Sequence, residues 1–427
     1  MIVRQAVAGF ADARLEALGD WLQRRQAWIR ALQWALVVVY YGLLFGPALL
    51  PQPADRAAAL HGMAGFAEIV FWGLWWPAVI LGTMLFGQFW CGVFCPDGAL
   101  TEWASKHGRG GKIPAWMRWS GWPLLAFSLV VFYEHLVDAY QSPRAIVVTL
   151  GGASLAAVLC GWLIGRGKRV WCRYLCPAGG LFSLLARCAV LHFRVDRAAW
   201  DGAPKPLPRA VDCPLLLDVR RLRGNEKCSM CGRCSGHRAA VRLAWRSSAE
   251  EVAGAWDRPA SIGGAIGIIV VLFGLGFGVM HPAPEMAGMW RASGIAPSLS
   301  PRFVHILSGA GMLTLCLTVG LSIAAMGNRL LFVRQAFMLI PLGGMTWLLG
   351  AMQHACRLAG ELGFPVGGFQ AGLAWGLPAI GCAWSLYVGG RFGRAHPVGR
   401  LPRLAFPMLV IALAVLYSPL SAPYAVR

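Results

Sequence analysis

The chain has 427 residues, of which 57% are hydrophobic and 14% are charged. Its mean hydropathy of +0.56 lies outside the usual range of soluble domains and predicts a membrane protein. A formal net charge of +20 is also found in nucleic-acid-binding proteins, but here the basic residues lie in loops between apolar stretches, which excludes that class.

Residues 1–30 form an amphipathic, arginine-bearing segment without the cleavable apolar core of a signal peptide. Apolar stretches of the roughly 20 residues that cross a bilayer follow it. The sequence therefore predicts an all-α polytopic membrane protein of about nine transmembrane helices. Eight or ten transmembrane helices are also compatible with the sequence, because the first, third and ninth stretches are short or interrupted by proline. The nine stretches lie near 31–50, 65–86, 119–137, 145–164, 260–280, 304–326, 336–355, 369–389 and 404–421.

The distribution of basic residues sets the expected orientation. Of the 39 Lys and Arg residues, 18 fall in residues 165–259. Loops rich in Lys and Arg stay in the cytoplasm, where thiols remain reduced and available to metals. We therefore expect a multi-pass protein of a bacterial inner (cytoplasmic) membrane with this loop in the cytoplasm.

An internal repeat is the main organising feature. Residues 89–96 and 170–177 share the pattern W-C-x3-C-P, which x-G extends to Gly98 and Gly179, at an offset of 81 residues and each after a pair of spans. A residue before proline is pushed out of helical geometry, so Cys95 and Cys176 are expected at a helix-to-loop break at the membrane surface.

Four cysteines of the repeats are therefore candidate ligands of one iron–sulfur site. They are Cys91, Cys95, Cys172 and Cys176. Redox-active dithiols and small buried packing residues are the alternatives, and Cys188 is an alternative ligand. Arg166, Lys168, Arg169 and Arg173 flank the second pair, where cations stabilise a negatively charged reduced cluster; cytoplasmic topology explains the same charges.

A second set of cysteines gives the strongest signal in the chain. Cys228, Cys231 and Cys234 have the C-x2-C-x2-C spacing that wraps three thiolates around one 4Fe-4S cluster, with a remote Cys-Pro supplying the fourth. Cys213, followed by Pro214, fits that role. A zinc site is the alternative. No Cys-Pro follows Cys234 at ferredoxin spacing, so we expect one cluster in this segment.

These features divide the chain into four predicted segments. The first is the N-terminal cytoplasmic segment. A membrane unit of two repeats and four helices follows, then a small cytoplasmic ferredoxin-like iron–sulfur segment, and last a C-terminal membrane domain of four to five helices. Their boundaries are 1–30, 31–177, 178–259 and 260–427.

The two span-terminal C-x3-C-P motifs and the ferredoxin-like segment resemble the membrane polyferredoxin family, which includes the NapH and NosR types and the oxidase accessory protein CcoG. The resemblance covers about residues 65–240 and implies electron transfer. More narrowly, residues 91–103 and 230–238 look like FtrD-type proteins of bacterial ferrous iron uptake systems. That resemblance implies an acceptor for electrons released when ferrous iron is oxidised during uptake.

The FtrD-type resemblance also implies partners: a membrane permease and periplasmic redox or metal-binding proteins. Separately, we expect contact with membrane lipid, name quinone as a further candidate partner and expect no nucleic acid. The leading hypothesis is an electron-transfer subunit without independent catalytic activity. The alternatives are a ferric or cupric metal reductase, a quinol-linked electron-transfer subunit of a respiratory reductase, and a zinc-binding transporter or assembly scaffold.

Overall fold

Among the residues that the computed structural model describes, seven helices are long and apolar enough to cross a membrane, which confirms the all-α polytopic class. They are Gln26–Leu49, Met63–Phe86, Pro143–Leu163, Ile262–Met280, Pro301–Ala324, Arg329–Glu361 and Gly367–Ala395. The structure describes residues 2–51, 53, 55–204, 210–253, 261–281 and 300–419.

Two of the nine expected spans are shorter helices. The third corresponds to α8 (Trp122–Leu136) and the ninth to α22 (Arg400–Leu416). Residues 420 and 421 of the ninth, like parts of the predicted segments 178–259 and 260–427, lie outside the described residues. Large apolar side chains on the spans, such as Val38 and Leu315, are exposed on the protein surface and contact lipid.

The chain divides into two compact units. Unit 1 comprises Met1–Leu43, Gly82–Pro123 and Leu150–Glu251, and unit 2 comprises Leu44–Leu81, Leu124–Thr149 and Val252–Arg427. All eight candidate cysteines of the sequence analysis belong to unit 1.

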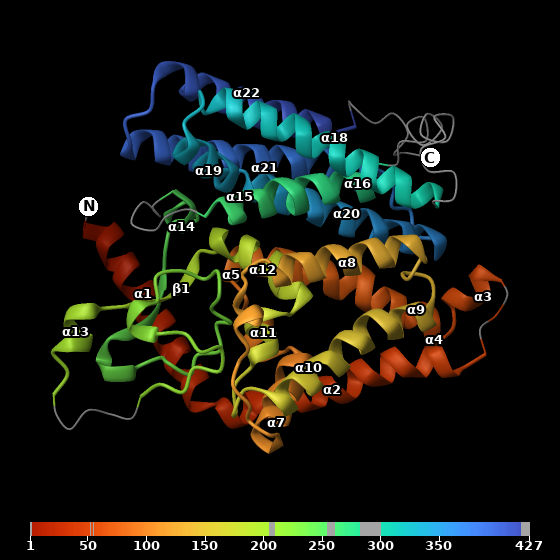
Figure 1. Ribbon diagram of the computed structural model, residues 1–427, viewed down its shortest axis with the longest axis horizontal. Helices are drawn as coiled ribbons and strands as arrows, with labels where there is room; N and C mark the ends of the chain where they lie inside the picture. Colours follow the sequence, from red (N-terminus) through yellow and green to blue (C-terminus); the bar gives the residue numbers. More distant parts are fainter. Residues whose placement is uncertain are drawn as a thin grey trace. The chain divides into compact units, whose positions relative to one another are not determined.

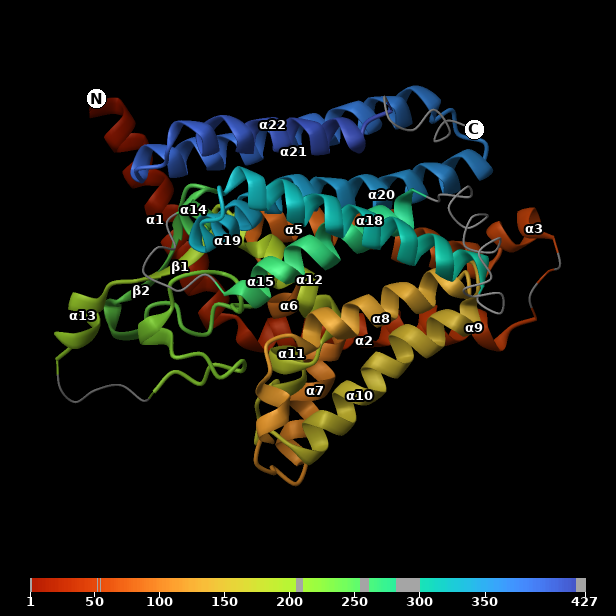
Figure 2. The same ribbon diagram turned by 45° about the horizontal axis from the view of Figure 1, so that its top comes forward.

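Unit 1 combines long and short helices with a small two-stranded sheet (Figure 1). Helices α7 and α10 lie side by side in Figure 2, and the Ser154 hydroxyl of α10 donates a 2.6 Å hydrogen bond to Asp97 of α7. The elements are α1 (Ile2–Arg24), α2 (Gln26–Leu49, up to Leu43), α6 (Phe89–Val93), α7 (Pro96–His107), α10 (Gly152–Leu163), α11 (Val170–Tyr174), α12 (Pro177–Leu185), β1 (Leu191–Val195), α13 (Arg197–Asp201), β2 (Val241–Trp245) and the start of α14 (Glu250–Ala253).

The strands β1 and β2 form an antiparallel pair in which Phe193 faces Leu243. Both side chains are buried in one apolar cluster with Val241 and Met230. Helix α1 packs against β2 and contributes Leu15 to this cluster. The sheet therefore gives the cysteine-bearing loop a small hydrophobic core of its own.

Unit 2 is a helical bundle in which side chains donate hydrogen bonds to backbone carbonyls of a π-helical stretch. In the π segment Ile268–Leu275, the carbonyls of Leu272 and Phe273 accept hydrogen bonds from Trp347 Nε1 (2.8 Å) and the Tyr417 hydroxyl (3.1 Å). Such bonds satisfy the backbone groups that a wider turn leaves without partners.

Two long helices of unit 2, α20 (Ile340–Glu361) and α21 (Gly367–Ala395), lie side by side. The other elements of unit 2 are the end of α2, α3 (Arg56–Leu60), α4 (Met63–Glu68), a π segment (Ile69–Trp75), α5 (Trp76–Phe86, up to Leu81), α8, α9 (Pro143–Ile146), a π segment (Val147–Gly151, up to Thr149), α15 (Ile262–Gly267), α16 (Gly276–Met280), α18 (Pro301–Ala324), α19 (Arg329–Met338) and α22.

Candidate metal centres

The two repeats have the same backbone geometry. In the first, the N–H groups of both residues after α6 donate to the Trp90 carbonyl, at 2.9 Å and 3.0 Å. In the second, the equivalent N–H groups after α11 donate to the Trp171 carbonyl at the same two distances. The chain then leaves the helix at Cys95 (φ −63°, ψ 120°) and at Cys176 (φ −56°, ψ 121°). The helix break predicted before each proline is confirmed.

The chain does not continue as a loop after these breaks. Cys95 and Cys176 are the N-cap residues of new helices, α7 and α12, with a proline at the first helical position. Burial raises the pKa of the Cys95 thiol to about 12 and that of the Cys176 thiol to about 11, and the backbone N–H groups of Gly98 and Gly179 offset part of this rise. Helix N-termini favour negative charge, so these N–H groups stabilise a sulfur that a bound metal has deprotonated.

The four cysteines of the two repeats lie close together; we call Cys91, Cys95, Cys172 and Cys176 the repeat quartet. Burial raises the pKa of the Cys91 thiol, and the neighbouring Cys95 and Cys176 raise it further. The pKa of Cys172 is raised by burial and then by the other three members of the quartet. Without a metal these thiols stay protonated at neutral pH, whereas a bound metal deprotonates its cysteine ligands.

The ferredoxin-like segment gathers a second set; we call Cys213, Cys228, Cys231 and Cys234 the loop quartet. All four line one small pocket with a cavity volume of about 20 Å³. Apolar side chains, including Phe193 and Val219, form most of the remaining lining. The four cysteines that the spacing singled out thus line the same pocket.

Positive backbone angles bend the loop around this pocket. Gly232 has φ +77° and Met230 has φ +54°, which is unusual for a residue with a side chain. The Met230 side chain is buried, and its N–H donates to the Cys228 sulfur at 3.5 Å. Packing of Met230 in the core thus holds the conformation that turns the thiols inward.

Both quartets fit a 4Fe-4S cluster by their donor chemistry: four thiols, backbone N–H donors and, at the loop quartet, an apolar lining. Among the described residues, no group of three or more His, Cys, Asp or Glu side chains is placed to hold a single metal ion.

The second repeat holds the remote cysteine of the loop quartet in place. The N–H of Arg169 donates to the Pro214 carbonyl at 2.7 Å, and Lys168 donates to the Cys213 carbonyl at 3.1 Å and pairs with Asp212. The first repeat makes a similar contact, because the buried Gln88 side chain donates to the Glu226 carbonyl at 2.8 Å.

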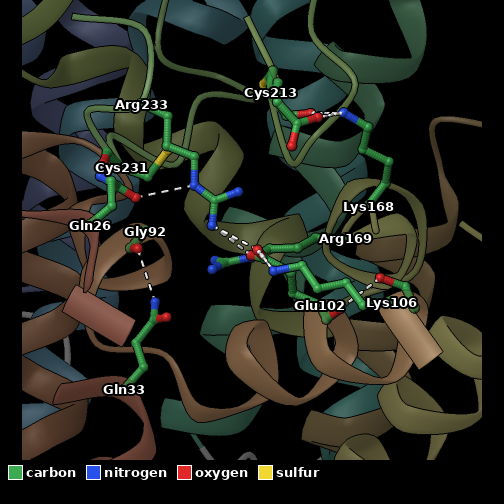
Figure 3. A network of polar contacts seen from close by, with 12 residues as sticks. Gln26, Gln33, Gly92, Glu102, Lys106, Lys168, Arg169, Cys213, Cys231 and Arg233 are labelled. Atoms are coloured by element: carbon green, nitrogen blue, oxygen red, sulfur yellow. Dashed lines mark hydrogen bonds and ion pairs between the residues drawn. The ribbon is translucent and has the colours of Figure 1, made fainter. Parts of the chain in front are cut away.

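A buried ion-pair network lies between the two quartets (Figure 3). Arg169 donates to Glu102 from Nε at 2.8 Å and to the Cys91 carbonyl from Nη1 at 3.1 Å. Arg233, which lies between Cys231 and Cys234 in the sequence, donates to both Glu102 oxygens at 2.8 Å. Burial alone would raise the pKa of the Glu102 carboxyl, but Arg169 and Arg233 outweigh it and lower the pKa to about 2.

Helix α2 adds two amide side chains to this region, also seen in Figure 3. Gln26 donates to the Cys231 carbonyl at 2.8 Å and accepts from Arg233 Nε at 3.2 Å. Gln33 donates to the Gly92 carbonyl at 3.0 Å. These contacts, and the role of Glu102, were not predicted from sequence. The sequence indicates Gln33 only as a polar residue within an apolar span, and its side chain is buried in the structure.

Cys188, the alternative ligand, lies among charged side chains. Burial raises the pKa of its thiol, and its charged neighbours are Glu251, Arg246 and Arg187. The side chain is fully buried. These surroundings are those of a packing residue.

Comparison with known proteins supports the iron–sulfur interpretation. A family model described as a 4Fe-4S binding domain matches residues 69–114 and 147–197, which include the whole repeat quartet. With seven helices of membrane-spanning length, this match defines the chain as a membrane iron–sulfur protein.

Two curated proteins are similar to parts of the chain. Protein NirI of Paracoccus denitrificans (strain Pd 1222) is 26% identical over 242 residues, which cover 50% of this chain and 35% of that protein. Uncharacterized protein MJ0749 of Methanocaldococcus jannaschii is 27% identical over 164 residues, 37% of this chain and 63% of that protein. The chain thus spans less than two thirds of either relative. No solved structure matches it.

Proposed function

We propose that the chain is a one-electron relay of a bacterial inner membrane, with one 4Fe-4S cluster held by the repeat quartet and a second by the loop quartet. The observation that carries this proposal is that both quartets lie in unit 1 and share the Glu102 ion-pair network. Two neighbouring redox centres are what a relay requires, and the proposal assigns no reaction on a carbon substrate.

The residues around the quartets have defined tasks in this proposal. When bound, a 4Fe-4S cluster supplies one-electron redox chemistry. The eight thiolates hold the clusters, and the backbone N–H groups of Gly98, Gly179 and Met230 stabilise the charge on sulfur. The apolar lining of the loop quartet limits access of water, which affects the reduction potential.

We further propose that the relay serves ferrous iron uptake and accepts electrons released when ferrous iron is oxidised. Support comes from the FtrD-type resemblance of residues 91–103 and 230–238. In this role the partners are a membrane permease and periplasmic redox or metal-binding proteins. The loop quartet lies on the cytoplasmic side, as the concentration of basic residues in 165–259 indicates.

Uptake of radioactive ferrous iron in the native host tests this role. Deleting the chain lowers uptake, the wild-type chain restores it, and a chain carrying Cys231→Ser does not. Cys316→Ser is the matched control, because Cys316 is exposed on α18 and belongs to neither quartet. Normal uptake with Cys231→Ser contradicts the uptake role.

Reporter fusions test the orientation. Fusions after Gly108 and after Gly202 are expected to report a cytoplasmic location. A periplasmic signal from the fusion after Gly202 contradicts the proposal, because the loop quartet would then lie in an oxidising compartment.

A further inference from the structure

The Glu102 carboxylate pairs with two arginines, and each of them lies next to a different cysteine quartet. Glu102 lies on α7, the helix that Cys95 caps. Arg169 is the N-cap residue of α11, which carries Cys172, and Arg233 lies within the loop quartet. Figure 3 shows the guanidinium groups of both arginines in contact with Glu102.

These charges are shielded from solvent. The side chains of Glu102 and Arg169 are 7% and 3% exposed, and that of Arg233 is 16% exposed. Lys106, one helical turn along α7, is more exposed and pairs with Glu102 at 3.1 Å. Buried charges are weakly screened, so a change at any one of them is felt across the network.

Arg169 lies within electrostatic range of both quartets. Burial would lower its pKa, but Glu102 first and then Cys172 and Cys231 raise it. Its guanidinium also donates to the carbonyl of Cys91. A charge near Arg169 therefore acts on thiolates of the repeat quartet and of the loop quartet together.

On the basis of the proposed function, we propose that Glu102 is a positioning residue that sets the reduction potentials of both centres jointly. Its negative charge offsets the two buried arginines, and its two oxygens hold them at fixed places between the quartets. Reduction adds negative charge at a quartet, which the arginines favour and Glu102 opposes. Removing the charge of Glu102 is therefore expected to make both centres easier to reduce.

A redox titration of the purified full-length protein, followed by electron paramagnetic resonance, tests this inference. For Glu102→Gln we expect both midpoint potentials to rise. One charge at about 10 Å with an effective dielectric constant near 20 changes the reduction equilibrium by roughly tenfold, which is about 59 mV for one electron. Glu16→Gln is the control, because Glu16 is an exposed acid of α1 in the same unit.

A second variant keeps the inference testable if Glu102→Gln fails to retain iron. Arg233→Gln removes a positive charge from the same network and is expected to lower both potentials. Shifts of opposite sign in the two variants are not expected from a purely structural role.

The outcomes separate the two proposals. A wild-type protein without two redox-active centres overturns the proposed function. A wild-type protein with both centres, together with iron-replete Glu102→Gln or Arg233→Gln protein whose potentials are unchanged or shifted at one centre alone, overturns this inference and leaves the relay intact.

Discussion

The backbone of Gly92 lies directly against the carbonyl of Ser229. A Cβ atom at position 92 would be 2.0 Å from that oxygen and 2.9 Å from the Cys231 nitrogen. Gly92 follows Cys91 in the first repeat, and Ser229 follows Cys228 in the loop quartet. The equivalent position of the second repeat is Arg173, so the glycine is required by this contact and not by the repeat motif itself.

Gly92→Ala is therefore expected to push the loop quartet away from the first repeat. Overpacking of this kind costs about 1–3 kcal/mol, so iron of the loop quartet should pass to a chelator about tenfold faster or more. The control is Gly152→Ala in α10, where an added Cβ meets no atom within 4 Å. Equal rates for the two variants would show that the close contact is not maintained in solution.

We expect substitutions within the repeat quartet to have coupled effects on the iron content of the chain. Cys95→Ser and Cys176→Ser should each remove about four iron atoms per chain, and the double variant should lose little more. Ligands of one site act as a unit, and their effects are not additive. Iron analysis checks this directly. Additive losses would indicate two separate sites, and unchanged iron in all three variants would indicate redox dithiols.

We expect the membrane helices to fold and insert without a metal centre at the loop quartet. Cys231→Ser should abolish the paramagnetic signal of one reduced centre, while the chain remains in the membrane fraction. The spans insert through hydrophobicity and internal backbone hydrogen bonding, which need no metal. Carbonate extraction of membranes measures insertion, and release of the variant into the supernatant would contradict this prediction.

His192 of β1 predicts a pH-dependent stability of the small sheet. Burial, then Arg246 and Arg194, lower its pKa to about 4, below the value near 6.5 of an unfolded chain. The unfolded state therefore binds the proton first, and stability present above about pH 6.5 is lost as the pH falls toward 4.

Hydrogen exchange of the β1 and β2 amides between pH 7 and pH 4.5 measures this effect. The loss of protection relative to His192→Gln protein should grow as the pH falls. His107→Gln serves as the control, because His107 is an exposed histidine at the end of α7. A constant difference between wild type and His192→Gln across the range would refute the assignment to His192.

Sequence alone predicted the membrane class, the repeat and the two groups of four cysteines, because apolar length and cysteine spacing are local signals. The restart of a helix at Pro96 and Pro177 follows from the same residues, although we expected a loop there. Spacing also indicated Cys213 as the fourth member of the loop quartet.

Long-range partners could not be predicted in this way. Glu102 meets Arg233 across 131 residues, and Gln26 meets Cys231 across 205 residues. Such contacts depend on how α2, α7 and the cysteine loop pack in three dimensions. The sequence showed Arg169 near the second repeat, but not the carboxylate that it shares with Arg233.

The iron and sulfide content of anaerobically purified protein tests the central claim most directly. Two 4Fe-4S centres predict about eight iron atoms and about eight sulfides per chain, a brown colour that bleaches with dithionite, and two paramagnetic species after reduction. A colourless protein that carries zinc, or a protein with iron for a single centre, would contradict the account.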